Sequence, residues 1–130
     1  MITIDAQHKT LGRVASAAAK ALLGKHSASF AKNVTAPDEV KIVNASKIQL
    51  SGSKTKDKEY VRYSGYPGGQ KKETYAMLVA RRGHKEAIRR AVLGMLPKNK
   101  LGEKLIKKLR VYAGEAHPHE AQKPKVLNIA

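Results

Sequence analysis

Apolar and polar positions at the start of the chain predict a strand followed by a helix. Residues 1–6 alternate between the two kinds, which is typical of a short strand with one buried face. From Leu11 to Leu23 apolar residues recur at helical spacing, and many are alanines, which favour helix and permit close packing. Thr10 stands at the expected N-cap position, and Gly24 marks the end of the helix.

A second strand is predicted at Val40–Val43, where Val40, Ile42 and Val43 are apolar. A basic loop, residues 25–37, separates this strand from the helix. A strand, a helix and a second strand form a βαβ unit, which implies parallel pairing and a right-handed crossover.

The middle of the chain gives weaker signals. Residues 47–51 show a brief strand pattern, residues 51–57 are polar and turn-like, and Glu59–Tyr63 is a candidate extended segment. Residues 64–72 contain three glycines and a proline, which predicts a loop with no regular structure.

Helical spacing returns after Thr74, which is a candidate N-cap. The first helix buries Tyr75, Leu78 and Val79 and ends near residues 81–83, and a second is predicted over residues 85–93. The inward residues of the second helix are Ala87, Ile88, Ala91 and Val92.

Pro97 breaks that helix, so residues 94–97 (GMLP) form a hinge, with Met95 and Leu96 interpreted as a core plug rather than an apolar wedge into RNA. A third helix is predicted over residues 101–109. It places Leu101, Leu105, Ile106 and Leu109 inward and Lys100, Lys104, Lys107 and Lys108 outward. A last strand at residues 110–113 precedes a tail without regular structure.

Strands that alternate with helices predict an α/β sandwich with a mainly parallel sheet. The length of 130 residues fits one domain, residues 1–130. No apolar run approaches the ~18 residues of a membrane span, and the first residues lack the pattern of a secretion signal. The chain has no cysteine, which excludes disulfides, zinc–thiolate sites and thiol catalysis and is compatible with the cytosol.

Charge narrows the function. There are 26 Lys and Arg against 10 Asp and Glu, giving a net charge of +16. Between Arg81 and Arg110 stand eleven basic residues and only the acids Glu86 and Glu103, whereas an ordinary solvated helix face mixes both signs. Such a surface indicates a polyanionic partner, with nucleic acid first and an anionic membrane surface second.

Two motifs leave alternatives open. The glycine loop lacks the spacing of a nucleotide P-loop, so it is either a loop laid on an RNA backbone, with Tyr63 or Tyr66 stacking on bases, or an ordinary surface loop. His117 and His119 are either RNA hydrogen-bonding groups, packed histidines or, least favoured, metal ligands. No arrangement for nucleophilic or acid–base catalysis stands out, and Asp5, at the end of the first strand, is interpreted as a cap or turn residue.

A set of short motifs occurs in order along nearly the whole chain: KTLGR at 9–13, VNA at 43–45, SGYPGG at 64–69, GMLPKNKLG at 94–102, VYAG at 111–114 and HPHEAQKP at 117–124. In these motifs the sequence closely resembles the bacterial large-subunit ribosomal protein thirteen family. The resemblance implies a three-layer α/β/α sandwich with a mainly parallel core sheet of about four strands, plus a basic loop and a C-terminal tail.

It also implies a non-enzymatic structural constituent of the large ribosomal subunit, which binds large-subunit ribosomal RNA, helps early subunit assembly and acts in the cytoplasm. The expected partners are ribosomal RNA and neighbouring large-subunit proteins, with the protein a monomer within the ribosome and with no cofactor, metal, membrane or small-molecule substrate. Compared with many family members, the chain is expected to lack an N-terminal extension, its first helix is richer in alanine, and Gly83 and His84 stand where a proline is frequent.

The basic surface and the segments implied by the resemblance together give the residues expected to contact RNA. They are Arg13, Lys25, Lys54, Lys56, Arg62, Tyr66, Gly68, Gly69, Lys71, Lys72, Arg81, Arg82, Arg89, Arg90, Lys98, Lys100, Lys104, Lys107, Lys108, Arg110, His117, His119 and Gln122. Two other functions are compatible with the sequence: a metal-dependent hydrolase or phosphotransferase using His117 and His119, and a free-standing regulator that binds messenger RNA or DNA.

Overall fold

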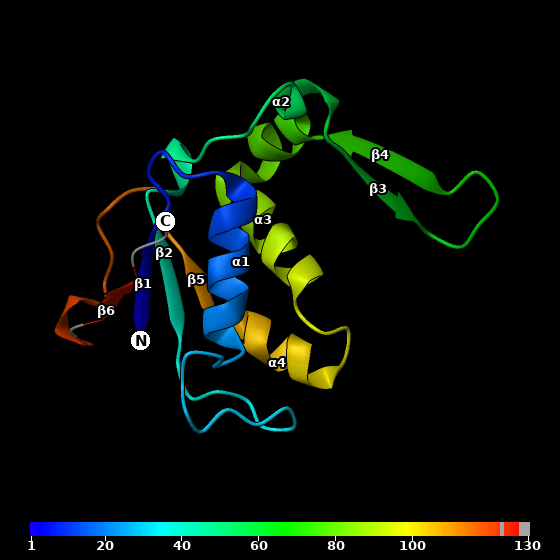
Figure 1. Cartoon of the computed structure of the whole chain (residues 1–130). Helices are drawn as coiled ribbons and strands as arrows, with labels where there is room; N and C mark the ends of the chain where they lie inside the picture. The colour runs from blue at the N-terminus through cyan, green and yellow to red at the C-terminus, as the bar shows by residue number, and fades with distance from the viewer. Residues whose placement is uncertain (123, 128–130) are drawn as a thin grey trace.

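A four-stranded parallel sheet forms the centre of the computed structural model, which describes residues 1–122 and 124–127 (Figure 1). Lys123 of the HPHEAQKP motif therefore lies outside the described residues. The strand order is β5–β2–β1–β6, and every neighbouring pair is parallel. The bounds are β1 (Ile2–Asp5), β2 (Val40–Val43), β5 (Leu109–Val111) and β6 (Lys125–Leu127). The predicted α/β fold with a parallel sheet of about four strands is confirmed.

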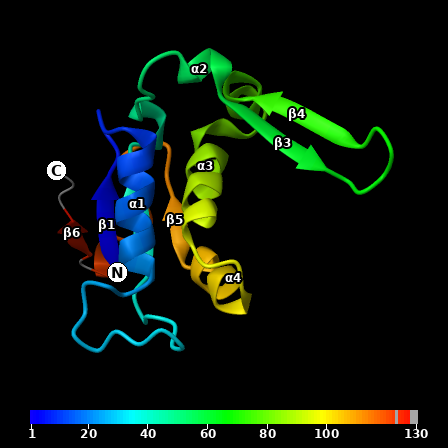
Figure 2. The same ribbon diagram turned by 45° about the vertical axis from the view of Figure 1, so that its right-hand side comes forward.

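The predicted βαβ unit is confirmed as β1, α1 (Leu11–Leu22) and β2. Ile4 lies beside Ile42 in register, and both are fully buried against the helices. The apolar stripe of α1 is buried along its length, and its alanines let α1 and α3 pack side by side (Figures 1 and 2). Thr10 occupies the N-cap position, but its hydroxyl makes no capping hydrogen bond.

The two helices predicted between residues 75 and 93 are joined in α3 (Tyr75–Met95), which is kinked at Gly83. Gly83 has φ 74° and ψ 173°, a backbone conformation that glycine adopts without a steric penalty. At the start of α3 the Thr74 hydroxyl accepts a hydrogen bond from the Met77 N–H, so the predicted N-cap is confirmed.

The hinge after α3 leads into α4 (Lys100–Lys107), which the Asn99 side chain caps by accepting from the Gly102 N–H at 2.9 Å. Leu96 is buried in the core, as predicted for a plug, whereas Met95 is exposed. The prediction that the helix continues to Leu109 was wrong, because Leu109 begins β5 and pairs with Val40 in the parallel sheet.

An antiparallel hairpin projects from the body (Figure 2). It consists of β3 (Glu59–Tyr63), which was predicted as extended, and β4 (Gln70–Thr74). The prediction of a loop over residues 64–72 was wrong for the last three of them, because Gln70, Lys71 and Lys72 pair with β3. The turn itself is confined to residues 64–69.

Two short helices occupy the polar middle segment. A single-turn α2 (Lys54–Asp57) lies where a turn was predicted. The strand predicted at residues 47–51 is not formed, because η1 (Ala45–Lys47) enters the segment and Gln49 makes an isolated bridge with Thr10 instead of a continuous strand. Ile48 and Leu50 pack against the core instead of extending the sheet.

The prediction of a tail without regular structure was wrong for this C-terminal segment, which comprises residues 114–122 and 124–127 of the described chain. It contains η2 (Glu120–Gln122) and β6, which pairs with β1. It also covers the face of the sheet opposite the helices, where Lys41 is fully buried and its Nζ lies 2.6 Å from His117 Nε2. The sheet therefore lies between a layer of helices and a layer made by the C-terminal segment.

Candidate nucleic-acid interface

The lysines of α4 form an exposed cationic face. Lys100, Lys104 and Lys107 lie at positions i, i+4 and i+7, so they project from one side of the helix, while Leu105 and Ile106 are buried on the other. Lys108 was predicted to face outward with them, but it is partly buried. Its ammonium donates to the backbone carbonyl oxygen of Ala36 and ties the loop at residues 25–37 to the end of α4.

The hairpin carries a second group of exposed predicted contacts. Tyr63 and Tyr66 are exposed, Tyr66 by 74%, and such rings offer faces on which unpaired bases can stack. Around them lie Arg62, Lys71 and Lys72, all exposed, of which Lys72 also pairs with Glu59 at 3.6 Å.

The glycine loop closes on itself at the hairpin tip. The Gly69 N–H donates to the Tyr66 carbonyl oxygen at 2.9 Å, and the Ser64 N–H donates to the Gly69 carbonyl oxygen at 3.3 Å. A Cβ at Gly69 would lie 2.9 Å from the Tyr66 carbonyl oxygen and would also displace the Ser64 hydroxyl, so a side chain here would require the turn to shift. Because the Gly69 N–H is used inside the turn, it is not oriented as part of a phosphate cradle.

Three arginines predicted to contact RNA are paired with acids of the same chain. Arg81 Nε and Nη2 donate to Glu73 Oε1 at 2.9 and 2.6 Å, and Arg90 Nη1 lies 3.5 Å from Glu73 Oε2. Arg82 and Arg90 also pair with Glu86, at 3.6 and 3.3 Å. The hydrogen bond from Arg81 is the main cause that lowers the pKa of Glu73 below its ordinary value, so this carboxylate stays ionised.

His117 and His119 pack against the body. His117 Nε2 faces the Lys41 ammonium, and the rings of both histidines pack around Tyr112, with centroids 6.2 and 6.0 Å from it. Burial lowers the pKa of Lys41, which the negative charge of Glu120 partly offsets. Of the three roles left open for His117, the structure favours the packed one. Over residues 1–122 and 124–127, no three His, Asp or Glu side chains gather as a metal site.

Asp5 also has an internal role. It ends β1, and its Oδ1 accepts hydrogen bonds from Asn44 Nδ2 at 2.9 Å and from the Gln7 N–H at 3.0 Å. Partial burial raises the pKa of Asp5, but these hydrogen bonds and nearby lysines outweigh burial and lower it overall. Asp5 therefore organises the turn after β1, as its interpretation as a turn residue anticipated.

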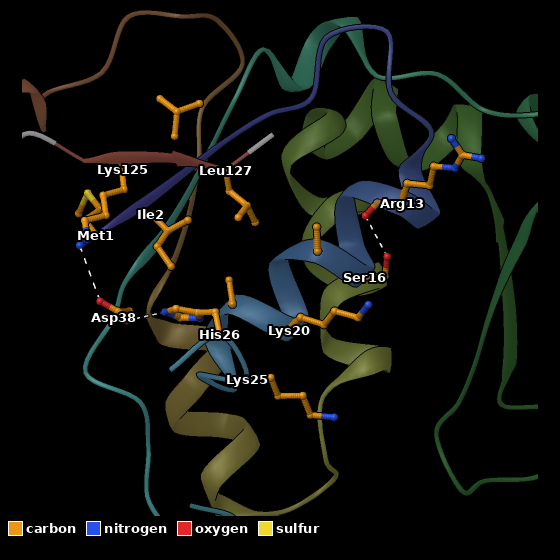
Figure 3. A pocket seen from close by; sticks show the side chains of 13 residues that line it. Met1, Ile2, Arg13, Ser16, Lys20, Lys25, His26, Asp38, Lys125 and Leu127 are labelled. Atoms are coloured by element: carbon orange, nitrogen blue, oxygen red, sulfur yellow. Dashed lines mark hydrogen bonds and ion pairs between the residues drawn. The ribbon is translucent and has the colours of Figure 1, made fainter. Parts of the chain in front are cut away.

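A groove of about 830 Å³ lies between α1 and the edge strand β6 (Figure 3). Its lining is partly apolar and includes Ile2 and Leu127. The predicted contacts Arg13 and Lys25 lie on its α1 side, and Lys20 and Lys125, which were not among the predicted contacts, line it too. They could not be assigned to a groove without knowing that β6 pairs beside β1.

The remaining predicted contacts are dispersed. Lys54 and Lys56 are exposed on α2, while Arg89, Lys98, Arg110 and Gln122 are exposed on α3, the segment just before α4, β5 and η2. The cations thus surround the body on several sides. No helix in the part of the chain that the structure describes is long and apolar enough to cross a membrane.

A parallel α/β body, a protruding hairpin and cations on several faces define a class of strongly basic α/β proteins. The model of the family described as ribosomal protein L13 matches residues 1–118. The chain is 52% identical over 126 residues to large ribosomal subunit protein uL13 of Symbiobacterium thermophilum, covering 97% of this chain and 87% of the relative. It is 53% identical over 125 residues to the protein of the same name from Treponema pallidum, covering 96% and 87%. The chain belongs to the ribosomal protein L13 family.

Proposed function

We propose that this protein is a structural constituent of the large ribosomal subunit that binds large-subunit ribosomal RNA and helps early subunit assembly, within the cytoplasm. The observation that carries the proposal is the match over nearly the whole chain to relatives named as large ribosomal subunit proteins. The charge of +16 supports it, since a surface of this sign binds a polyanion. Neighbouring large-subunit proteins are the other proposed partners, and the protein enters the subunit as a monomer.

The exposed cations divide the proposed RNA contact into three parts. The lysine face of α4 and the hairpin tip present side chains that are free to reach phosphates and bases, and the groove beside β6 presents four more cations. Such contacts read the shape and backbone of folded RNA more than its sequence. The body would thereby hold several RNA segments in register, which is a structural role and requires no chemistry.

Binding to large-subunit RNA fragments, measured beside unrelated duplex RNA across a salt series, tests the proposal. We expect the fragment that contains the site to bind more tightly than the unrelated duplex, and the affinity for both to fall as salt rises. Equal affinity for all RNAs would overturn the specific site. Co-sedimentation with large subunits through a high-salt gradient separates this role from that of a free-standing regulator of messenger RNA, which would be left at the top.

A further inference from the structure

The hairpin that carries the exposed tyrosines touches the body only at its base. Most residues of β3 and β4 are exposed, and the buried or half-buried ones, Tyr60, Glu73 and Thr74, lie next to α3. One backbone hydrogen bond, from the Tyr75 N–H to the Lys58 carbonyl oxygen at 2.8 Å, ties the two ends of the hairpin together. The direction in which the hairpin projects therefore depends on the side chains at this base.

A single carboxylate connects the hairpin to both parts of the kinked helix. Glu73 belongs to β4, Arg81 precedes the kink at Gly83, and Arg90 follows it. Both arginines pair with Glu73, one on each carboxylate oxygen. A second contact reinforces the arrangement, because the Arg90 guanidinium lies 5.2 Å from the centre of the Tyr60 ring on β3.

These pairs are better placed than ordinary surface ion pairs. The side chains of Glu73 and Arg90 are only 15% and 20% exposed. Arg81 donates from two nitrogens to one oxygen, which constrains its orientation. The depressed pKa of Glu73 agrees with this geometry, since the ionised form is the one that the arginines stabilise.

We propose that Glu73 is a positioning residue for RNA binding, which fixes the hairpin on α3 through Arg81 and Arg90 so that the hairpin tip meets RNA in one orientation. The proposal rests on the proposed function. It assigns the two arginines to the protein's own architecture, whereas their charge alone suggested phosphate contacts. By its charge alone, a carboxylate should weaken binding to a polyanion. The positioning role requires Glu73 to strengthen this binding instead, and this difference gives the proposal a sharp test.

Glu73→Gln removes the carboxylate charge with almost no change in shape and makes the protein more positive. Pure electrostatics predicts tighter binding to any RNA. The positioning role predicts weaker binding to the large-subunit fragment, by about three- to tenfold if the hairpin spends only a tenth to a third of its time in the competent orientation. Binding to unrelated duplex RNA should stay equal or increase.

Glu59→Gln is the matched control. It removes the same charge from the same hairpin, but Glu59 pairs only with the exposed Lys72 and faces away from α3. Its binding to the fragment should match or exceed that of the wild type. Arg81→Lys keeps the charge and loses the two-nitrogen contact, so it should weaken fragment binding in the same direction as Glu73→Gln.

A spectroscopic measurement on the free protein makes the test independent of RNA. The chain has no cysteine, so Tyr66→Cys at the hairpin tip and Ser16→Cys on α1 accept spin labels at those two sites alone. Glu73→Gln and Arg81→Lys should broaden the distribution of distances between the labels, and Glu59→Gln should leave it narrow. If the distribution stays narrow and fragment binding is unchanged or tighter in Glu73→Gln, the positioning role is wrong. If the wild type itself shows no preference for the fragment, the proposed function fails, while the distance distribution still decides whether Glu73 fixes the hairpin.

Discussion

Removing the three exposed lysines of α4 should weaken RNA binding and reduce its dependence on salt. Lys100, Lys104 and Lys107 lie on one face of the helix and are exposed, so a single RNA backbone can meet all three. Each phosphate contact contributes about 0.7 to 0.9 to the slope of log affinity against log salt, which are the values for single strands and for duplex DNA. Three lost contacts reduce the slope by about 2.1 to 2.7.

That change of slope gives a measurable quantity. When salt is raised threefold, the wild type should lose about ten- to twentyfold more affinity than Lys100→Gln/Lys104→Gln/Lys107→Gln. Filter binding or fluorescence anisotropy at four or five salt concentrations measures both slopes. Thermal unfolding should change by less than about 0.5 kcal/mol, because all three side chains are exposed on the surface.

The triple replacement of the same lysines by arginine is the control, since it keeps three positive charges on the same face and should keep the slope. Lys108 is left out of the set because its ammonium bonds to Ala36, so its loss would disturb the body. An unchanged slope in the glutamine variant would refute the assignment of α4 to the RNA contact. A slope that falls equally in the arginine variant would show that folding, not charge, had changed.

Further substitutions test the body of the protein and the turn of the hairpin. Lys41→Met should raise the free energy of unfolding by about 1–2 kcal/mol at pH 7, since relief of the buried charge outweighs the lost bond to His117. Burial lowers the pKa of Lys41 in the folded protein, so the unfolded chain binds this proton more tightly. The stability of the wild type should therefore rise as the pH increases from the folded pKa towards 10.5. Thermal melts of Lys41→Met should not show this rise. Gly102→Ala should cost about 1–3 kcal/mol in urea unfolding, because its Cβ would lie 2.0 Å from the Pro97 carbonyl oxygen, whereas Gly94→Ala meets nothing within 4 Å and should be neutral or stabilising. Gly69→Ala should open the hairpin turn, which would weaken RNA binding while leaving the melting temperature of the body nearly unchanged.

The elements that the sequence predicted correctly are those whose own residues carry the signal. In α1 the apolar residues recur at the helix period and are the ones that are buried, so local pattern and tertiary packing agree. In β1 and β2 the apolar residues marked the strands, although both strands are buried on both faces. Strand β4 was missed because its sequence, QKKET, is polar throughout, and it pairs with β3 outside the core. Strand β6 was missed because it has only three residues and its partner, β1, stands at the other end of the chain.

The same distinction holds for the site. Exposed lysines on α4 followed from helical spacing, since the buried side of that helix was evident. The pairing of Arg81 and Arg90 with Glu73 could not be predicted, because it requires a hairpin that folds Glu73 back onto α3. The burial of Lys41 could not be predicted either. It points to the face of the sheet opposite the helices, and this face is covered only by the C-terminal segment that carries His117.

Because β1 pairs with β6, the central sheet can be completed only after β6 has been synthesised. The two strands pair in parallel, with Ile2 opposite Lys125, so the sheet brings together residues that are separated by most of the chain. Synthesis proceeds from the N-terminus, so β1, α1 and β2 can associate early. The free edge of β1 stays unpaired until β6 has left the exit tunnel of the translating ribosome. Closing so long a loop is slow compared with local helix formation. The groove beside β6, with its four cations, therefore forms only after β6 has been synthesised, and any RNA that it binds can be captured only after that point.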